Sequence, residues 1–262
     1  ALLTRDKLAM RARWSAAGLP GPDFVAISSV QDLYAAAERF ARPFVLKDAW
    51  GAGAIGTQIV VPGSDLGSIF ARSRSAIVEA RDRGIGEFSP LVTGSIRLIA
   101  EELMEGAADE WFADPARGDF VSVEGIVVDG VPRSLALTDR MRPLPPFCES
   151  ADLAPSAVDA GMQKQLFAMA EQAVDALGLQ YCATHTEFKL MRDRKVGLLE
   201  VGARIGGTAI ARQTYAVHGI CLVDQLISGL LGMEPEVRSS SRCTTQAAAA
   251  AGLEVLGADA WG

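Results

Sequence analysis

The sequence predicts a mixed α+β fold whose sheets are antiparallel. Two strand-like runs, residues 120–128 and 131–138, flank Asp129-Gly130, a dipeptide that strongly favours the two-residue turn of a β-hairpin. A second hairpin is predicted around the glycine-rich stretch 51–56. Strands and helices do not alternate in the regular β-α-β order of a doubly wound parallel sheet. We therefore expect antiparallel sheets and no Rossmann domain.

The composition is that of a globular protein with an acidic balance. Of the 262 residues, 49% are hydrophobic and 22% charged, and no apolar run reaches the ~18 residues that a membrane-spanning helix needs. With 25 Lys and Arg against 32 Asp and Glu, the formal net charge is -7, which disfavours a long basic face for nucleic acid. We expect a soluble protein that binds neither membranes nor nucleic acid.

Two features of the sequence bear on the cellular compartment. The four cysteines are scattered with no C-x-x-C pair, which argues against a zinc site and against a disulfide framework. The N-terminus has neither a start methionine nor the regions of a signal peptide. We expect a cytoplasmic protein whose sequence begins within a longer chain.

The first hundred residues are predicted to form helices that alternate with short strands. A helix capped by Thr4 comes first, then a strand at 23–27, then a helix that starts with a capping box of Ser28 and Gln31 and runs to residue 40. Strands at 44–47 and 58–61 form the hairpin with the glycine-rich tip, and a helix at 64–84 leads to a strand at 95–104.

Strands dominate the second part of the chain. The Asp129-Gly130 hairpin is followed by a proline-rich loop and a helix that begins at Ser156 and ends before Gly178. The remaining predicted elements are strands at 182–191 and 196–201 and helices at 208–218 and 222–231.

A pair of glutamates is the most informative spacing in the sequence. If the turn between the last two strands is centred on Asp193-Arg194, Glu187 and Glu200 lie directly opposite each other. Like charges in that position destabilise a hairpin, so a divalent cation between them would explain the arrangement, and oxygen-only ligands favour Mg²⁺. A solvated polar face with salt bridges to Lys189 explains the same residues without a metal.

The alternation of the strand at 182–191 separates its charged and apolar side chains. His185, Glu187 and Lys189 share one face, whereas Thr184, Thr186, Phe188 and Leu190 share the other. The charged face is therefore predicted to be a surface distinct from the core.

The glycine-rich stretch 51–56 matches G-x-G-x-x-G, but its context is not that of a dinucleotide-binding motif. A strand-like run follows it instead of a helix, and Thr57 stands where a Walker A loop requires lysine. Lys47 precedes the loop at the end of the incoming strand. A glycine hairpin that covers phosphates beside a lysine is one interpretation, and an ordinary flexible loop is the other.

Other candidate groups carry less information. Arg204 follows Glu200 by four residues at the end of a strand, where it could meet a phosphate or a developing oxyanion, although a surface position is the commoner explanation of one arginine. His185 is placed in or near the site and His218 is expected to be structural. No Ser-His-Asp or Cys-His pattern is visible.

Taken in order along the chain, these residues resemble the motifs of ATP-grasp enzymes. The order is Lys7, Lys47 with the glycine loop, the run Glu101, Glu102, Leu103 and Met104, then Glu187, Glu200 and Arg204. Residues 121–130, 148–155, 178–191 and 197–207 resemble in particular the bacterial L-amino-acid ligases, the dipeptide synthetases of the bacilysin type. The resemblance covers most of residues 1–232, and residues 233–262 yield no prediction of function.

The resemblance implies a fold and a set of residue roles. The fold is the ATP-grasp, in which two α+β subdomains grip ATP between antiparallel sheets, here with a lid subdomain at 20–95 and a larger subdomain made of 1–19 and 96–262. The N-terminal domain of the family is expected to be absent. The implied ATP-binding residues are Lys7, Lys47, Gly51, Gly53, Gly56, Glu101, Glu102, Leu103, Met104 and Lys189; the metal ligands are Glu149, Glu187 and Glu200; Arg204 and Glu149 are catalytic; and His185, Arg204, Gly207 and Thr208 contact substrate.

The implied reaction is an ADP-forming ligation of a carboxylate to an amine through an acyl phosphate. The implied cofactors are ATP and Mg²⁺ or Mn²⁺, and the implied substrates are amino acids. The resemblance is compatible with a homodimer. Many superfamily members have asparagine where this chain has Gly202, so one contact is absent or replaced. Two alternatives are an ATP-grasp ligase for another carboxylate and a nucleotide-binding module without catalysis.

Thr208 gives the only indication of substrate size. Some dipeptide synthetases that the sequence resembles carry a bulky aromatic residue at the matching position, which restricts the first amino acid to small side chains. Threonine leaves more room, so we expect a first substrate larger than alanine. A helix cap explains the same residue without a role in specificity.

Overall fold

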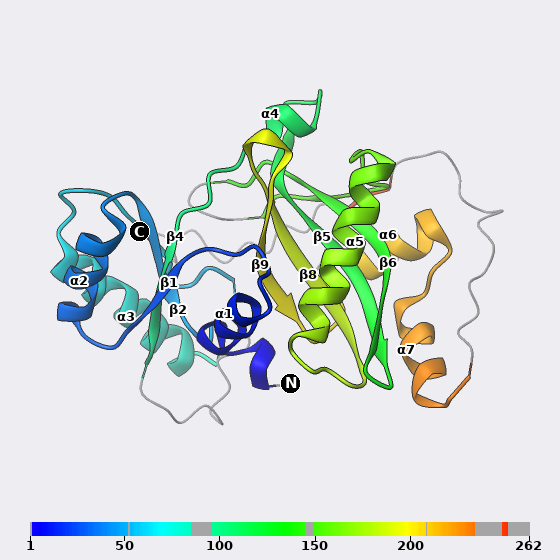
Figure 1. Cartoon of the computed structure of the whole chain (residues 1–262), viewed down its shortest axis with the longest axis horizontal. Helices are drawn as coiled ribbons and strands as arrows, with labels where there is room; N and C mark the ends of the chain where they lie inside the picture. Colours follow the sequence, from blue (N-terminus) through cyan, green and yellow to red (C-terminus); the bar gives the residue numbers. More distant parts are fainter. Residues whose placement is uncertain are drawn as a thin grey trace. The chain divides into compact units, whose positions relative to one another are not determined.

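The structure of the chain is a computed structural model, and it describes residues 2–51, 53–84, 96–144, 149–207, 209–233 and 248–250. The chain divides into two compact units, residues 1–105 and residues 106–262 (Figure 1). The flanks 1–19 and 96–105, which we expected with the larger subdomain, group with the first unit. The two units are described separately below.

The first unit contains a four-stranded antiparallel sheet in the order β1-β4-β2-β3. The predicted glycine-tipped hairpin is confirmed as β2 and β3. The elements of this unit are η1 (Leu2–Thr4), α1 (Lys7–Ala16), β1 (Phe24–Ile27), α2 (Val30–Phe40), β2 (Phe44–Asp48), β3 (Gln58–Val60), α3 (Leu66–Asp82) and β4 (Leu98–Glu102).

Helices α2 and α3 cover one face of this sheet. Leu33 of α2 and Ile77 of α3 are fully buried in one core with Leu46 of β2. Because side chains alternate along a strand, the neighbours of these core residues project to the other face of the sheet. Lys47 follows Leu46, and Glu101 follows the buried Ala100 of β4. The core thus directs a lysine and a glutamate to the same opposite face.

The helix starts in this unit differ from the predicted ones by one or two residues. Asp6 caps α1 by accepting the backbone N–H of Ala9 at 3.1 Å, whereas Thr4 lies in the 3-10 turn that precedes it. The capping box of α2 is made by Ser29 and Asp32. Aspartate accepts hydrogen bonds from the free N–H groups of a helix start as well as threonine or glutamine does. The residue types alone therefore did not show which of the neighbouring candidates caps each helix.

The second unit contains a six-stranded sheet in the order β10-β7-β6-β5-β8-β9, in which every pairing is antiparallel. Figure 1 shows α5 running along the strands of this sheet. The elements of this unit are α4 (Ala108–Trp111), β5 (Arg117–Val128), β6 (Val131–Met141), β7 (Asp152–Ala154), α5 (Ala160–Asp175), β8 (Cys182–Leu190), η2 (Arg192–Arg194), β9 (Val196–Gly202), α6 (Ile210–His218), α7 (Leu222–Leu230) and β10 (Ala248–Ala250).

The hairpin of β5 and β6 turns where the sequence predicts. Asp129 and Gly130 both have positive φ, 51° and 75°, as the tight hairpin turn requires. Val128 and Val131 form the first cross-strand pair beside the turn. This hairpin supplies the two long central strands on which the polar residues described below are arranged.

Three short elements of the second unit were not predicted. They are α4, β7 and β10, and each has only three or four residues. A segment this short cannot display a helical or strand period, so only its tertiary partners define it. Among the described helices, none combines the length and the hydrophobicity that crossing a membrane would require.

Candidate nucleotide and metal site

The two glutamates of the second unit face each other across neighbouring strands. Glu187 of β8 and Glu200 of β9 are direct partners in the register, as the sequence predicts. The pairs nearer the turn are offset by one residue, and a β-bulge between Glu187 and Phe188 corrects the offset by placing one extra residue, Leu199, on β9. The opposition of the two glutamate residues therefore depends on this bulge.

Glu187 is held in its charged form by its neighbour on the same strand. The Nε2 atom of His185 lies 3.1 Å from Oε1 of Glu187. Burial by itself would raise the pKa of Glu187, but the hydrogen bond and charge of His185, together with the charges of Arg140 and Arg204, lower it to about 2. The charged face predicted for residues 185 and 187 is confirmed by this contact.

His185 makes a second and closer contact with a residue of the central strand. Its Nδ1 atom lies 2.6 Å from Oε1 of Glu124, which is completely buried on β5. Burial by itself would lower the pKa of His185, but the Glu124 charge and hydrogen bond, with Glu187, raise it to about 10. His185 is therefore a buried cation between two carboxylates.

A buried arginine extends this network toward β7. Arg140 of β6 donates to Oγ of Ser122 at 3.0 Å, and Ser122 donates to Oε1 of Glu124 at 2.9 Å. The Arg140 guanidinium also pairs with Asp152 at 3.0 Å and lies 3.8 Å from Glu149. One face of the sheet thus carries a continuous row of charged and hydroxyl groups.

Glu149 and Arg204 lie close enough to this row to interact with it electrostatically. Burial raises the pKa of Glu149, Arg140 lowers it, and Glu187 and Asp152 raise it further. Arg204 is exposed in the loop after β9, where it donates to the Ile205 carbonyl at 3.1 Å. Glu149 and Arg204 therefore each interact electrostatically with Glu187.

The other residues predicted around this site are less closely associated with it. Lys189 forms an ion pair with Asp119 at 2.7 Å. Gly207 is exposed in the same loop as Arg204. Thr208 lies outside the described residues.

The first unit holds Lys47 in a buried ion-pair cluster. Its Nζ atom lies 2.6 Å from Glu101, and the same carboxylate accepts a 2.8 Å hydrogen bond from the buried Arg11. Burial by itself would raise the pKa of Glu101, but Lys47 and Arg11 lower it to about 2. The carboxylate of Glu101 pairs with these two cations, and its backbone lies within the sheet between β1 and β2, opposite Phe24 and Val45.

The glycine loop is anchored at both ends. Buried Lys7 donates through Nζ to the carbonyl of Gly51, and Ser73 of α3 donates to the carbonyl of Gly56 at 2.7 Å. Gly53 and Gly56 both have positive φ, 67° and 70°. Four residues of the predicted ATP-binding set, Lys7, Gly51, Gly53 and Gly56, therefore lie in or against one hairpin tip.

The run predicted to contact adenine lies at the end of β4. Glu102 donates its backbone N–H to the Asp23 carbonyl at 2.8 Å and pairs with Arg42 at 2.7 Å. Leu103 and Met104 are half-buried and follow the last strand residue, at the end of the first unit.

The residues present fit a magnesium ion that is bound together with a nucleotide. Among the described residues no group of three or more His, Cys, Asp and Glu side chains forms a metal cage. Two glutamates that are partners across neighbouring strands nevertheless suit Mg²⁺, which at nucleotide sites commonly has one or two protein carboxylates, with phosphate oxygens and water as its other ligands. The negative charge of Glu187 suits this role.

Sequence reasoning missed several buried charged residues. Glu124, Arg140, Asp152 and Arg11 are at most 3% exposed. The available signal was the charge itself, because Glu124 is the one charged residue in the mainly apolar run 120–128, and a buried carboxylate requires a partner. The sequence could not identify that partner.

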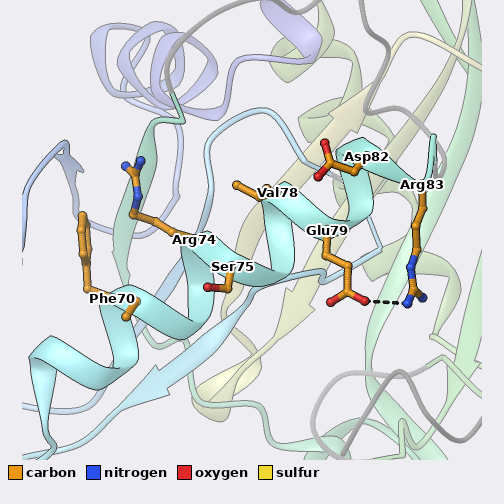
Figure 2. A pocket seen from close by; sticks show the side chains of 8 residues that line it. Phe70, Arg74, Ser75, Val78, Glu79, Asp82 and Arg83 are labelled. Atoms are coloured by element: carbon orange, nitrogen blue, oxygen red, sulfur yellow. Dashed lines mark ion pairs between the residues drawn. The ribbon is translucent and has the colours of Figure 1, made fainter.

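A surface pocket lies elsewhere, along the outer face of α3 (Figure 2). Phe70, Arg74 and Val78 line it, and Glu79 forms an ion pair with Arg83 at 2.6 Å. All of its lining residues belong to α3 or its C-terminal cap, and none was predicted for the site. We assign it no role.

Comparison with known proteins identifies sequence relatives that are ligases. No family model matches the chain. The alanine–anticapsin ligase of Bacillus subtilis is 30% identical over 226 residues, which are 86% of this chain and 46% of that protein. The L-arginine-specific L-amino acid ligase of Bacillus subtilis is 30% identical over 132 residues, 49% of this chain and 29% of that protein. The chain spans about half the length of the alanine–anticapsin ligases that it matches.

Solved structures show the same fold. The L-amino acid ligase from Bacillus licheniformis matches with a TM-score of 0.70 and 22% identity, over 95% of this chain and 55% of that one. The biotin carboxylase of Campylobacter jejuni, in its β,γ-ATP complex, matches with a TM-score of 0.72 and 18% identity, over 95% of this chain and 50% of that one. The chain therefore has the ATP-grasp fold, and its sequence resembles those of the bacterial L-amino-acid ligases.

Proposed function

We propose that this chain takes part in an ATP-dependent, ADP-forming ligation that joins the carboxylate of one amino acid to the amine of another. The observation that carries the proposal is the direct opposition of Glu187 and Glu200 on neighbouring strands, with Glu187 held as an anion. This arrangement suits a divalent cation that accompanies nucleotide phosphates. The names of the sequence relatives support an amino acid as substrate.

Residues of the first unit are proposed to bind the nucleotide. Lys47 lies on the sheet face opposite the α2 and α3 core, and the glycine loop follows its strand. An ammonium group and bare backbone N–H groups suit phosphate oxygens. Lys7, which bonds the first residue of the loop, is assigned to the same phosphates, and the run 101–104 to adenine.

Residues of the second unit are proposed to bind the metal and the reacting groups. Glu187 and Glu200, with Glu149 beside them, would hold Mg²⁺ or Mn²⁺, which supplies charge neutralisation at the phosphate oxygens when bound. Arg204 would stabilise the oxyanion that develops at the acyl carbon. Lys189 is assigned to ATP, and Gly207 and Thr208 to the substrate. His185, whose two ring nitrogens contact Glu124 and Glu187, would act on the substrate through Glu187 and not by direct contact.

The proposed reaction has two steps that need no protein nucleophile. A carboxylate oxygen attacks the γ-phosphorus of ATP and ADP leaves, which gives an acyl phosphate. The amine nitrogen then attacks the acyl carbon, phosphate leaves, and the nitrogen loses a proton to form the amide. The protein contributes positioning and stabilisation of negative charge, as in other phosphoryl transfers.

ADP release in the presence of a panel of amino acids tests this proposal. An amino-acid ligase should release ADP when suitable pairs of amino acids are added, and mass spectrometry should detect the matching dipeptide. Stimulation by other carboxylates alone would indicate a different ATP-grasp ligase. Nucleotide binding without ADP release under any condition would indicate a module without catalysis and would contradict the proposal.

A further inference from the structure

The polar face of the large sheet is organised around one residue that has no role so far. Glu124 lies at the centre of β5, and its carboxylate is completely buried. In the register, Glu124 is the partner of His185, and Ser122 is the partner of Glu187. Alternation along the strands therefore places these four side chains on the same face of the sheet.

Glu124 contacts each branch of the network. Its Oε1 atom lies 2.6 Å from His185, which in turn contacts Glu187 at 3.1 Å. The same oxygen accepts the hydroxyl of Ser122, which accepts from Arg140. Removing Glu124 would leave the imidazole of His185 without the contact that fixes its ring.

Glu124 also defines the position of the loop that carries Arg204. Gly206 packs directly on the ion pair, because a Cβ atom added there would lie 2.9 Å from Oε2 of Glu124 and 2.9 Å from Nδ1 of His185. Separations below 3.0 Å require atoms to move, so a glycine is needed at this point. The Glu124–His185 pair therefore contacts Glu187 through His185 and also packs against the loop that carries Arg204.

We propose that Glu124 is a positioning residue, which holds Glu187 through His185 in the orientation that binds the metal. The inference rests on the proposed function, because it presupposes that Glu187 is a metal ligand. Hydrogen-bonding partners behind metal ligands fix their orientation, and their loss typically weakens metal affinity about ten- to a hundredfold. We expect a weakening of this size when Glu124 is changed.

The test compares metal binding in Glu124→Gln, His185→Asn and the double variant. Mn²⁺ binding with saturating ADP is followed by the electron paramagnetic resonance signal of free Mn²⁺, corrected for ADP alone. Each single variant should weaken Mn²⁺ binding about ten- to a hundredfold. The double variant should bind no more weakly than His185→Asn, because Glu124 acts through His185. Additive losses, or binding by Glu124→Gln equal to that of the parent, would overturn the inference.

Asp139→Asn is the matched control for general loss of stability. Asp139 is also a completely buried carboxylate of the central strands, but it pairs with Arg117 and Ser156 instead of His185. This variant should lower the melting temperature and leave Mn²⁺ affinity unchanged. An equal loss of affinity in Asp139→Asn would show that the effect of Glu124 is structural and would contradict the inference.

Gly206→Ala tests the same support if Glu124→Gln does not fold. The added Cβ atom should displace the ion pair, weaken Mn²⁺ binding and raise the Mg²⁺ concentration that gives half-maximal ADP release. Parent-like values for both quantities would contradict the inference. Failure of the parent itself to bind Mn²⁺ with ADP would contradict the proposed function, and the inference would fall with it.

Discussion

At the scale of single residues, buried charges in this protein occur in groups whose members stabilise one another. Glu101 lies between Lys47 and Arg11 in the first unit, and His185 lies between Glu124 and Glu187 in the second. Each group is costly to bury and even more costly to break, because removing one partner leaves the others without a counter-charge. Changing a member of such a group should therefore cost stability, whereas changing a glutamate outside the groups should not.

Changing Glu200 to glutamine should separate catalysis from stability. The variant should lose ATP turnover if the facing glutamates bind metal, while its apo form stays as stable as the parent or becomes slightly more stable, because a like-charge repulsion is removed. ADP release and thermal melts measure the two effects. Glu38→Gln, the same chemical change on the exposed face of α2, should alter neither. Turnover equal to that of the parent would exclude a metal role for Glu200.

Changing Glu101 to glutamine should destabilise the protein and alter its response to acid. The free energy of unfolding should fall by about 3–5 kcal/mol near neutral pH, because Lys47 and Arg11 lose their counter-charge. The folded-state pKa of Glu101, about 2, lies below its ordinary value of 4.5, so its stabilisation is present above pH 4.5 and disappears as the pH falls toward 2. The free-energy difference between parent and variant in urea unfolding should therefore shrink across that window. A difference that is constant with pH would contradict this assignment.

At the scale of elements, the tip of the β2 and β3 hairpin is fixed by backbone contacts at both ends. Lys7 bonds the carbonyl of Gly51, and Ser73 bonds that of Gly56. Gly53 and Gly56 have the same left-handed conformation but different surroundings, because Gly53 faces open space whereas Gly56 packs on Ser73 and Ile77 of α3. The two glycines therefore provide a matched pair.

Alanine at Gly53 and alanine at Gly56 should differ in their cost to stability. Gly53→Ala should lower the free energy of unfolding by only about 1–2 kcal/mol, because alanine is less stable than glycine in a left-handed backbone conformation. Gly56→Ala should lose more, since its Cβ atom would lie 2.8 Å from the backbone oxygen of Ser73. Urea unfolding of both variants measures the difference. Equal losses would mean that the end of the loop is not packed on α3 in solution.

At the scale of the whole molecule, each unit has its own sheet and its own group of residues with a proposed role. Lys47 and the glycine loop belong to the first unit, and the facing glutamates belong to the second. Nucleotide together with the metal ion should stabilise the chain more than nucleotide alone.

ATP with Mg²⁺ should raise the melting temperature. A ligand at a hundredfold excess over its Kd adds about 2.7 kcal/mol, and for a chain of this size each kcal/mol corresponds to about 2–4 °C. ATP with EDTA should give a smaller shift, because the phosphates then lack the cation that Glu187 and Glu200 are proposed to bind. The absence of a shift with either mixture would contradict nucleotide binding, and equal shifts would contradict the metal role of the two glutamates.

The sequence by itself determined the fold class, the two hairpins and the opposition of Glu187 and Glu200. These features depend on local signals, namely turn dipeptides, the two-residue period of strands and the number of residues between them. The residue order also identified the resemblance to ATP-grasp enzymes.

Only the tertiary structure decided how the opposition of Glu187 and Glu200 is achieved and what supports it. The turn is centred on Asp193 and not between Asp193 and Arg194, which shifts the partners beside it by one residue, and the bulge at Leu199 restores the pairing. The contacts of Glu124 and Glu101 join residues 61 and 90 positions apart, to His185 and Arg11 respectively. No local pattern specifies such partners, because a buried charge reveals that it needs a counter-charge but not which distant strand or helix will supply it.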